Sequence, residues 1–299
     1  MKKTTLFRKY LEDRDILLAP IAHDALGGLI AERAGFKCVI SAGFANSASL
    51  FAKPDVQLLT LNDAVDAAWR LADAVTVPVF GDADNGYGGT TNTARAIRSF
   101  EKAGVVGVLL EDQTFPKRCG HMAGKSIVPM EEYLAKIKAA VDARQDSEFT
   151  IVARTDALAL NGMDDALERL HRAIELGANG AFVEAPRTRD EMRLAASLPV
   201  PTLANIHLAG RTPVLPAGEL QELGFAIVAY PAVQSMAIAH HLLGVMHDLL
   251  KRGDVNDVGD RMLNFDQFTD LIGLPQLRSS EDMHARLAQE VAGKLSSVR

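Results

Sequence analysis

Short apolar runs alternate with longer amphipathic stretches along the whole chain. The runs are bounded by turn residues or charges, which is the pattern of strands that are buried on both faces of a parallel sheet. The stretches between them fit helices, most clearly Asp164–Leu176, where Ala166, Leu170 and Ile174 share one stripe. The predicted strands are Ile16–Pro20, Cys38–Ala42, Val79–Asp82, Val106–Glu111, Thr150–Thr155, Gly180–Glu184, Thr202–Asn205 and Phe225–Tyr230.

Four of the predicted helices end in the same way, with a glycine followed by an apolar residue. These glycines are Gly35, Gly104, Gly177 and Gly224. Glycine readily adopts the left-handed conformation that ends many helices, and the next residue leads into a strand. Eight strands with intervening helices predict an α/β fold, a (β/α)8 TIM-type barrel. An open, doubly wound sheet is the alternative.

The chain continues as helix after the eighth predicted strand. We expect helices at Val233–Lys251, Val255–Ile272 and Ser280–Leu295, with a break at Gly273-Leu274-Pro275. No linker or second domain is evident, so residues 1–299 are predicted to form a single barrel domain with residues 233–299 as a C-terminal helical extension. Such an extension has to pack on this barrel or on a neighbouring subunit.

Composition and charge argue against several classes of protein. Hydrophobic residues make up 48% of the 299 residues and charged residues 23%, which permits a large core and argues against disorder. The net charge is −6 and no basic patch stands out, so nucleic acid is not expected as a ligand. An anionic substrate would need local positive charge from side chains or a metal.

Nothing in the sequence indicates secretion or insertion into a membrane. The two cysteines, Cys38 and Cys119, do not make a disulfide scaffold. Met1–Arg14 is charged and lacks an apolar signal core, and no apolar run reaches the roughly 18 residues of a membrane span. The protein is therefore predicted to be cytoplasmic.

Polar residues stand at the C-terminal ends of most predicted strands, where (β/α)8 barrels form their active sites. Asp82-Ala83-Asp84 follows the third strand and leads into a glycine-rich loop, and Glu111 ends the fourth. Carboxylates at this spacing suit a hard cation such as Mg²⁺, with Mn²⁺ as a substitute. The alternative is that the two aspartates cap the next helix in a solvated turn. The full set of polar strand ends is Ser41, Asp82, Asp84, Glu111, Asp112, Arg154, Asp156, Glu184 and Asn205.

Cys119 lies in the loop after the fourth strand, within Lys117-Arg118-Cys119-Gly120-His121. Positive neighbours lower the pKa of a thiol and favour thiolate, so this cysteine is a candidate for acid–base chemistry on a carbanion. The alternative is an exposed loop with an inert cysteine. Arg154 suits a substrate carboxylate, or else an ion pair with Glu184 on the next strand.

These motifs together resemble the signature of the isocitrate lyase and phosphoenolpyruvate mutase superfamily. Glu111-Asp112-Gln113 precedes the Cys119 motif, and the remaining motifs follow in the order and spacing of that superfamily. The resemblance covers nearly the whole chain. It is closest to the methylisocitrate lyase, 2,3-dimethylmalate lyase, oxaloacetate hydrolase and carboxyphosphoenolpyruvate mutase branches. The remaining motifs are Asp82-Ala83-Asp84-Asn85-Gly86-Tyr87-Gly88, Ala153-Arg154-Thr155-Asp156-Ala157, Glu184-Ala185-Pro186 and Ala204-Asn205.

The resemblance implies a cofactor, an assembly and a reaction. It implies a small carboxylate substrate beside Mg²⁺, and a homotetramer, a dimer of dimers that exchanges a C-terminal helix. The implied reaction is cleavage of the C2–C3 bond of a 2-hydroxy dicarboxylate or tricarboxylate, after which Cys119, on a mobile loop, protonates the leaving enolate. The implied metal ligands, mostly through water, are Asp82, Asp84 and Glu111. The implied catalytic residues are Cys119, Lys117, His121 and Glu111, and the implied substrate contacts are Ser41, Ala42, Gly43, Asp55, Gly120, Arg154, Glu184 and Asn205.

Two segments depart from the pattern of the superfamily. His207 is unusual, Leu208 and Ala209 stand where related mutases carry glutamate and glycine, and Phe44 follows the second strand. Because both segments face the expected pocket, the substrate stays open. The alternatives are a phosphonate mutase or hydrolase, an oxaloacetate hydrolase or decarboxylase, and a barrel that keeps a ligand pocket without catalysis. The intact Cys119 favours carbon–carbon lyase chemistry.

Overall fold

The computed structural model describes residues 1–208 and 210–296, with side chains described up to residue 293. The chain divides into two units, Met1–Ala237 and Ile238–Arg299. The strands are β1 (Leu17–Pro20), β2 (Val39–Ser41), β3 (Val79–Asp82), β4 (Gly107–Glu111), β5 (Thr150–Thr155), β6 (Gly180–Val183), β7 (Leu203–Asn205) and β8 (Ile227–Tyr230). The helices of the first unit are α1 (Lys3–Glu12), α2 (Ala25–Arg33), α3 (Gly43–Phe51), α4 (Leu61–Ala74), α5 (Thr90–Lys102), α6 (Met130–Ala143), η1 (Ala157–Ala159), α7 (Met163–Glu175), α8 (Arg189–Ala196) and α9 (Ala217–Leu223).

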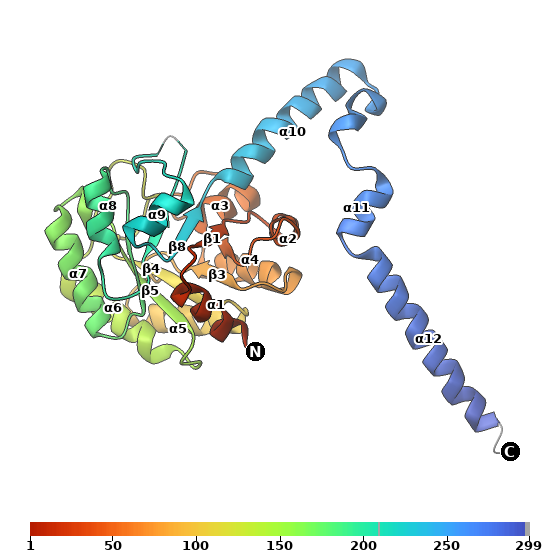
Figure 1. The fold of residues 1–299 in the computed structure, drawn as a ribbon, viewed down its shortest axis with the longest axis horizontal. Coiled ribbons are helices and arrows are strands. Elements are labelled where there is room, and N and C mark those ends of the chain that lie inside the picture. The colour runs from red at the N-terminus through yellow and green to blue at the C-terminus, as the bar shows by residue number, and fades with distance from the viewer. Residues whose placement is uncertain (209, 297–299) are drawn as a thin grey trace. The chain divides into compact units, whose positions relative to one another are not determined.

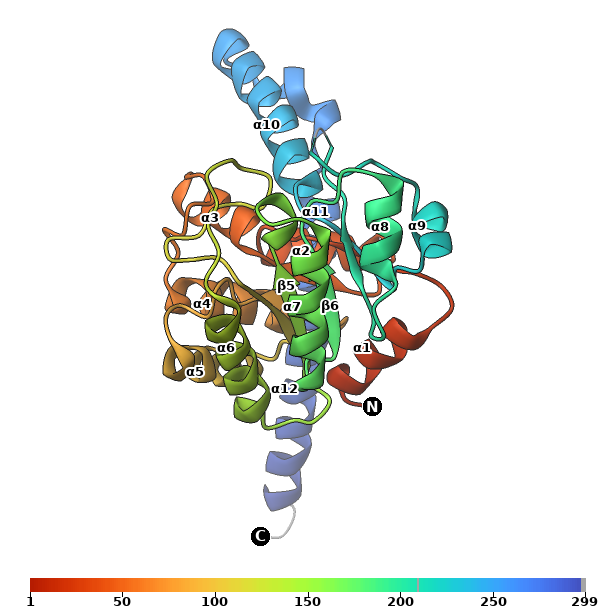
Figure 2. The same ribbon diagram turned by 90° about the vertical axis from the view of Figure 1, so that its left-hand side faces the viewer.

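The eight strands close into a parallel barrel. Strands β2 to β6 pair in sequence order, and β8 pairs with both β1 and β7. Single bridges, Ile21 with Ile40 and Ala181 with Thr202, join these two sets at both edges. Helices α4 to α8 lie outside the strands (Figure 1, Figure 2). The predicted (β/α)8 barrel is confirmed, each predicted strand lies within two residues of its observed bounds, and the open sheet is wrong.

Alternate residues of the strands fill the inside of the barrel. On β1, Leu17 and Ala19 belong to the interior cluster, whereas Leu18 packs against the outer one. Helix α1 adds Phe7, whose ring stacks on Phe80 of β3 with centroids 5.3 Å apart. The charged N-terminal segment therefore contributes an apolar face to the core, which its charge pattern did not predict.

The glycines at the helix ends have the predicted conformation. Gly35, Gly104, Gly177 and Gly224 have φ angles of +98°, +85°, +103° and +106°. A side chain with a Cβ rarely adopts these angles, so glycine lets each helix stop and the chain turn into the next strand. The local sequence thus sets where the outer helices end, and the barrel repeats follow.

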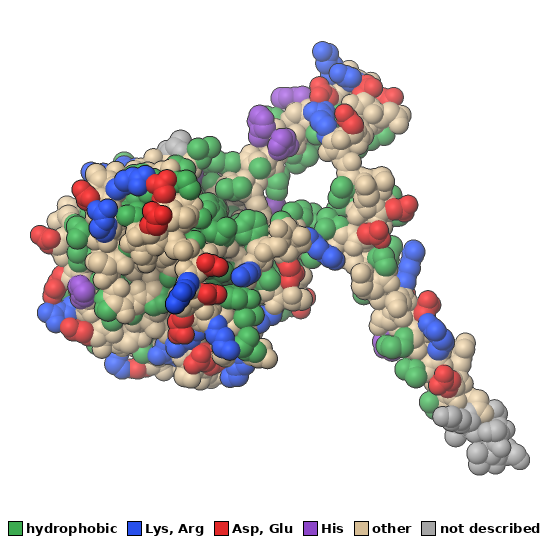
Figure 3. All heavy atoms as spheres, in the orientation of Figure 1, with side chains coloured by type: hydrophobic (Ala, Val, Ile, Leu, Met, Phe, Trp, Pro, Cys, Tyr) green, Lys and Arg blue, Asp and Glu red, His purple; other side chains and the backbone are tan. Residues whose placement is uncertain are grey.

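The C-terminal helices are α10 (Val233–Arg252), η2 (Val255–Arg261), α11 (Phe265–Leu271) and α12 (Leu274–Ser296), and α10 runs from the first unit into the second. The single predicted helix 255–272 is wrong, because Asn264 and Gln267 form a capping box that starts a new helix. Apolar side chains are exposed in the second unit, shown green in Figure 3, among them Leu250 at 86% and Phe265 at 78%. Within the described residues, no helix has the length and hydropathy to cross a membrane.

Candidate active site

The strand ends bring most of the predicted polar residues together at one end of the barrel. Because strand side chains alternate, the residue two positions after an interior residue points toward the same space. Arg154 thus follows the interior residue Val152. Asn205 follows Leu203 in the same way. A cavity of about 60 Å³ lies there, and the predicted site residues that line it are Ala42, Asp55, Asp82, Lys117, Cys119, Gly120, His121, Arg154, Glu184 and Asn205.

Four predicted residues do not line this cavity. Contrary to expectation, Ser41 turns away from it, because Ile40 and Ala42 on either side line the cavity and side chains alternate. The Ser41 hydroxyl instead accepts a hydrogen bond from Asn46 Nδ2 at 3.1 Å. The other three do not line the cavity but contact residues that do. They are Gly43, Asp84 and Glu111.

Lys117 lies between two carboxylates from different loops. Its ammonium is 2.9 Å from Asp55 Oδ1 and 2.7 Å from Asp84 Oδ1, and its side chain is 3% exposed. Burial by itself lowers the pKa of Lys117, but Asp84, Asp55 and Glu111 outweigh it and raise the pKa well above its usual range. A Cβ at position 43, now Gly43, would lie 3.0 Å from this ammonium, a contact tight enough that the ammonium would have to shift slightly.

Arg154 is surrounded by three carboxylates. Nη2 lies 3.2 Å from Glu111 Oε2 and 3.3 Å from Glu184 Oε2. Nε donates to Asp156 Oδ2 at 3.1 Å. Of the two sequence alternatives for Arg154, the ion pair with Glu184 is present, and Arg154 also lines the cavity. Within the part of the chain that the structure describes, the hydrogen bonds of the Arg154 guanidinium come from Nε and Nη2.

Negative charge exceeds positive charge in this buried cluster. Burial raises the pKa of Asp84 to about 6, even though Lys117 lowers it. Burial also raises the pKa of Glu111 well above its usual range, against Arg154 and Lys117. Glu111 Oε1 is buried and has no hydrogen-bond partner among the described residues. Six carboxylates face three cations, and the cluster consists of Asp55, Asp82, Asp84, Glu111, Asp156, Glu184, Lys117, Lys125 and Arg154.

The two aspartates of the Asp-x-Asp motif do not cap the next helix. Helix α5 has Gly89 at its N-cap and no side-chain cap. Asp82 accepts hydrogen bonds from the backbone N–H groups of Gly43 at 3.3 Å and Asp84 at 3.0 Å. The alternative of a solvated capping turn is wrong, because Asp84 is buried. In residues 1–208 and 210–293, no three His, Cys, Asp or Glu side chains converge on a ready-made metal site.

The loop that carries Cys119 is tied to the barrel through its backbone. The N–H of Cys119 donates to the carbonyl of Asp55 at 3.1 Å. The amide of Gln113 bonds both the N–H and the carbonyl of Arg118, at 3.0 and 2.8 Å. Gln113 was part of the sequence motif, but its position gave no signal for this clamp, because the contact depends on how the loop folds back.

The thiol of Cys119 has a raised pKa, whereas the sequence predicted a lowered one. Burial raises its pKa, and the backbone contact from His121 does not compensate. Lys117 is engaged by the two carboxylates described above, and Arg118 Nη1 donates to the carbonyl of Ala123 at 3.1 Å. The prediction of a lowered thiol pKa is wrong, because these neighbours in sequence are bound elsewhere.

His121 connects the Cys119 loop to the segment after β7. Its Nε2 lies 3.6 Å from Glu184 Oε1, and its ring centroid is 5.3 Å from that of His207. The N–H of Arg211 donates to His121 Nδ1 at 3.4 Å. Burial lowers the pKa of His121 despite Glu184, which favours the neutral imidazole.

Two of the departures from the superfamily pattern form one wall of the cavity. The rings of Phe44 and His207 meet edge to face with centroids 6.4 Å apart, and both line the cavity. Leu208 is 78% exposed and does not line it. Ala209 lies outside the described residues. The unusual Phe44 and His207 are thus placed to determine which substrates fit the cavity, whereas Leu208 is not.

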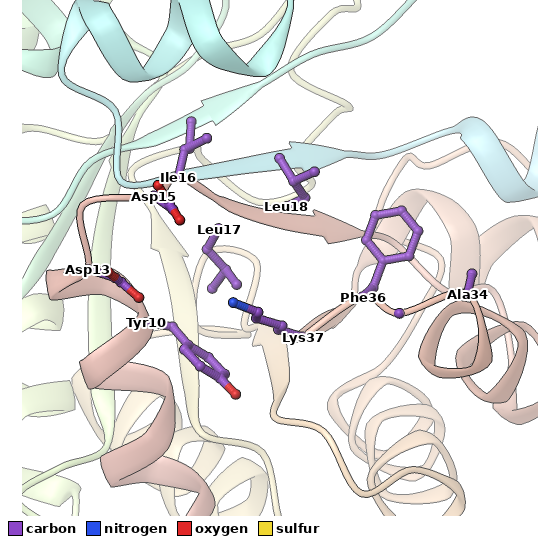
Figure 4. A pocket seen from close by; sticks show the side chains of 10 residues that line it. Tyr10, Asp13, Asp15, Ile16, Leu17, Leu18, Ala34, Phe36 and Lys37 are labelled. Carbon is purple, nitrogen blue, oxygen red and sulfur yellow. The ribbon is translucent and has the colours of Figure 1, made fainter.

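A second, larger hollow lies at the other end of β1. It has a volume of about 360 Å³ and lies between α1, β1 and the segment before β2 (Figure 4). Leu17 and Phe36 contribute apolar surface, and Lys37 Nζ lies 5.6 Å from the centroid of the Tyr10 ring. None of the predicted site residues lies in it, so volume alone does not identify the site.

Comparisons with known proteins agree with this geometry. The family model described as phosphoenolpyruvate phosphomutase matches residues 7–250. A 2,3-dimethylmalate lyase from Eubacterium barkeri is 42% identical over 95% of this chain and 99% of that protein. A 2-methylisocitrate lyase from Aeropyrum pernix is 35% identical over 98% and 95% of the two chains. The solved structure of a phosphonopyruvate hydrolase in complex with oxalate and Mg²⁺ has a TM-score of 0.85 and 28% identity, covering 94% of this chain and 99% of that chain. The chain therefore belongs to the phosphoenolpyruvate phosphomutase family, within the isocitrate lyase and phosphoenolpyruvate mutase superfamily that its motifs predicted.

Proposed function

We propose that this protein is a Mg²⁺-dependent carbon–carbon lyase. It cleaves the C2–C3 bond of a small 2-hydroxy dicarboxylate or tricarboxylate, of the methylisocitrate or substituted malate type, into a 2-oxo acid and a second carboxylate. The observation that carries this proposal is the position of Cys119, which lines the cavity together with Arg154, where burial raises the pKa of its thiol. A neutral thiol is the form that donates a proton to an enolate. Two of the similar proteins are named lyases.

The proton balance of this reaction assigns Cys119 its role. As the 2-hydroxyl loses its proton, its C–O bond becomes a carbonyl and the C2–C3 bond breaks. The bonding electrons move onto C3 and the adjacent carboxylate. Cys119 gives its S–H proton to C3, and the proton released by the hydroxyl balances the one that the thiol gives up.

The cavity supplies groups that orient such a substrate. Arg154 and Asn205 line it and would anchor carboxylates. The volume of about 60 Å³ is far below the several hundred Å³ of an ordinary ligand pocket. The Cys119 loop therefore has to open to admit substrate and close again to exclude water.

The residues of the site fit a divalent cation. Six carboxylates against three cations would repel a dianionic substrate unless further positive charge were present. Asp82, Asp84 and Glu111 would hold Mg²⁺, mostly through water, because this ion usually keeps several waters and takes one or two direct carboxylates. Glu111 Oε1, buried without a hydrogen-bond partner among the described residues, offers one such oxygen. When bound, Mg²⁺ supplies Lewis-acid stabilisation of the developing oxyanion.

A parallel substrate assay tests the proposal. The protein with Mg²⁺ would receive 2-methylisocitrate, isocitrate, 2,3-dimethylmalate or oxaloacetate, and phosphonopyruvate would be followed by ³¹P NMR. We expect a hydroxy acid to release pyruvate, glyoxylate or another 2-oxo acid, and EDTA to stop the release. Silence on every hydroxy acid would refute the lyase. A ³¹P change on phosphonopyruvate would then support phosphonate chemistry, and oxalate formed from oxaloacetate would support a hydrolase.

We also propose that the protein is a homotetramer. Apolar side chains are exposed in the C-terminal unit, and apolar patches of this kind mark interfaces with other chains. A second copy would cover them. Light scattering coupled to size-exclusion chromatography should give a mass four times that of one chain, and a monomer mass at micromolar concentration would refute the assembly.

A further inference from the structure

We propose that Lys125 is a positioning residue that fastens the Cys119 loop to Arg154 when the loop covers the cavity. The ammonium of Lys125 donates to the carbonyl of Gly120 and to Asp156 Oδ1, both at 2.6 Å. Asp156 in turn accepts from Arg154 Nε at 3.1 Å. Lys125 thus joins the residue next to the thiol to the guanidinium on β5.

This connection is buried along its length. The side chain of Lys125 is 3% exposed and that of Asp156 is 0% exposed. Asp156 is also fixed from the barrel side, because its N–H donates to Asp112 Oδ1 at 2.9 Å. Hydrogen bonds to charged groups are stronger than those between neutral groups, and more so away from water. Asp156 is therefore a firm anchor for the ammonium.

Lys125 lies at the base of the loop, where it can serve as a fixed contact. Gln113 and Ile127 form an antiparallel bridge that joins the two ends of the loop. The ammonium can stay on Asp156 while Gly120 moves away and returns. The loop approaches closely at Gly120, since a Cβ there would lie 2.4 Å from the carboxyl carbon of Glu184.

The consequences for chemistry rest on the proposed function. With the Gly120 carbonyl on Lys125, the Cys119 thiol is held over the cavity where C3 of the substrate would lie. The Lys125 ammonium also neutralises part of the charge of Asp156. The Arg154 guanidinium is therefore bound less strongly by that carboxylate. A lone lysine in a polar loop gave no sequence signal for this role, because its partner is 31 residues away.

Thiol alkylation tests the role of Lys125 without any substrate. Full-length protein would be treated with iodoacetamide, and labelling of the Cys119 and Cys38 peptides followed by mass spectrometry. Lys125→Met keeps the length of the side chain and removes the cation. We expect it to speed alkylation of Cys119 roughly tenfold or more, because one charged hydrogen bond no longer holds the loop closed. Lys125→Arg should restore much of the protection.

Two controls separate loop opening from general unfolding. Cys38 is fully buried in the barrel, so its labelling reports global unfolding. Lys138→Met removes an exposed lysine that pairs with Asp142 on α6, and should leave Cys119 labelling unchanged. A rate for Lys125→Met within twofold of wild type would overturn the proposal. So would equal rates for the Met and Arg variants, or labelling of Cys38 that rises in step with Cys119.

Activity gives an independent measure. In the 2-oxo acid assay, Lys125→Met should lower kcat by more than it raises KM, because the loop acts after substrate binds. If wild-type protein shows no lyase activity while the alkylation result stands, the proposed reaction is refuted but the role of Lys125 in holding the loop is not. If activity is present and Lys125→Met leaves kcat unchanged, the positioning role fails.

Discussion

Replacing Lys117 by methionine should destabilise the metal-free protein by about 3–5 kcal/mol at pH 8, the usual cost of removing one partner from a buried ion pair. Methionine has nearly the length of lysine, so packing changes little. At an effective dielectric constant of about 20, a contact of 2.7–2.9 Å contributes roughly 6 kcal/mol of Coulomb attraction. Burial of the three charges offsets much of this, but without Lys117 the desolvation of Asp55 and Asp84 remains uncompensated.

Proton uptake limits this loss. Burial already raises the pKa of Asp84 to about 6 while Lys117 lowers it, so the pKa rises further in Lys117→Met. At pH 5.5 Asp84 in the variant takes up a proton at little cost. The destabilisation should therefore shrink by about 1 kcal/mol or more between pH 8 and pH 5.5.

Urea denaturation in EDTA measures both effects. The protein concentration has to be the same for every variant, because an oligomer unfolds in a concentration-dependent way. Lys138→Met, which removes a half-exposed ion pair, is the control and should cost less than about 1 kcal/mol. Adding Asp55→Asn to Lys117→Met should recover part of the stability. A loss at pH 8 no larger than that of Lys138→Met would refute Lys117 as the counter-charge of a buried acidic site.

Three further predictions follow from the site. Cys119→Ser should lower lyase turnover by about 100-fold or more while Mg²⁺-dependent oxalate binding, measured by calorimetry, persists; wild-type turnover would rule out the thiol as proton donor. Gly120→Ala should lower kcat/KM at least ~10-fold, because its Cβ would lie 2.4 Å from the Glu184 carboxyl carbon. Gly89→Ala, with nothing within 4 Å, is the matched control, and equal kinetics for the two variants would contradict tight closure. In EDTA, the melting temperature should fall as the pH rises through about 6. A carboxyl group whose pKa is raised in the folded protein stabilises the fold fully below about pH 4, and this stabilisation is lost once the pH exceeds its folded-state pKa. Asp84→Asn should remove part of this slope, since burial also raises the pKa of Asp112 to about 6 and that of Glu111 well above its usual range, and it should weaken Mg²⁺ binding; an unchanged slope and metal affinity would exclude Asp84 from both roles.

The sequence by itself determined the barrel and most of the ring of residues around the cavity. Apolar runs marked the strands because both of their faces are buried, and glycines such as Gly35 marked helix ends because they adopt positive φ angles. The two-residue period of a strand is also local, so Arg154 and Asn205 could be placed at the open end. The same two-residue period points Ser41 away from the cavity, so its exclusion could have been predicted from the sequence.

Only the tertiary structure decided which charges meet and how much water reaches them. Lys117 looked like a group that would activate the adjacent thiol, yet it pairs with Asp55, which is 62 residues away in the chain. Burial then raised the pKa of Cys119, reversing the direction that its sequence neighbours suggested. Lys125 and Asp156 are also paired by the tertiary structure, because loops that follow neighbouring strands converge above the barrel. Desolvation and pairing depend on the whole surrounding fold, and no local stretch of sequence contains that information.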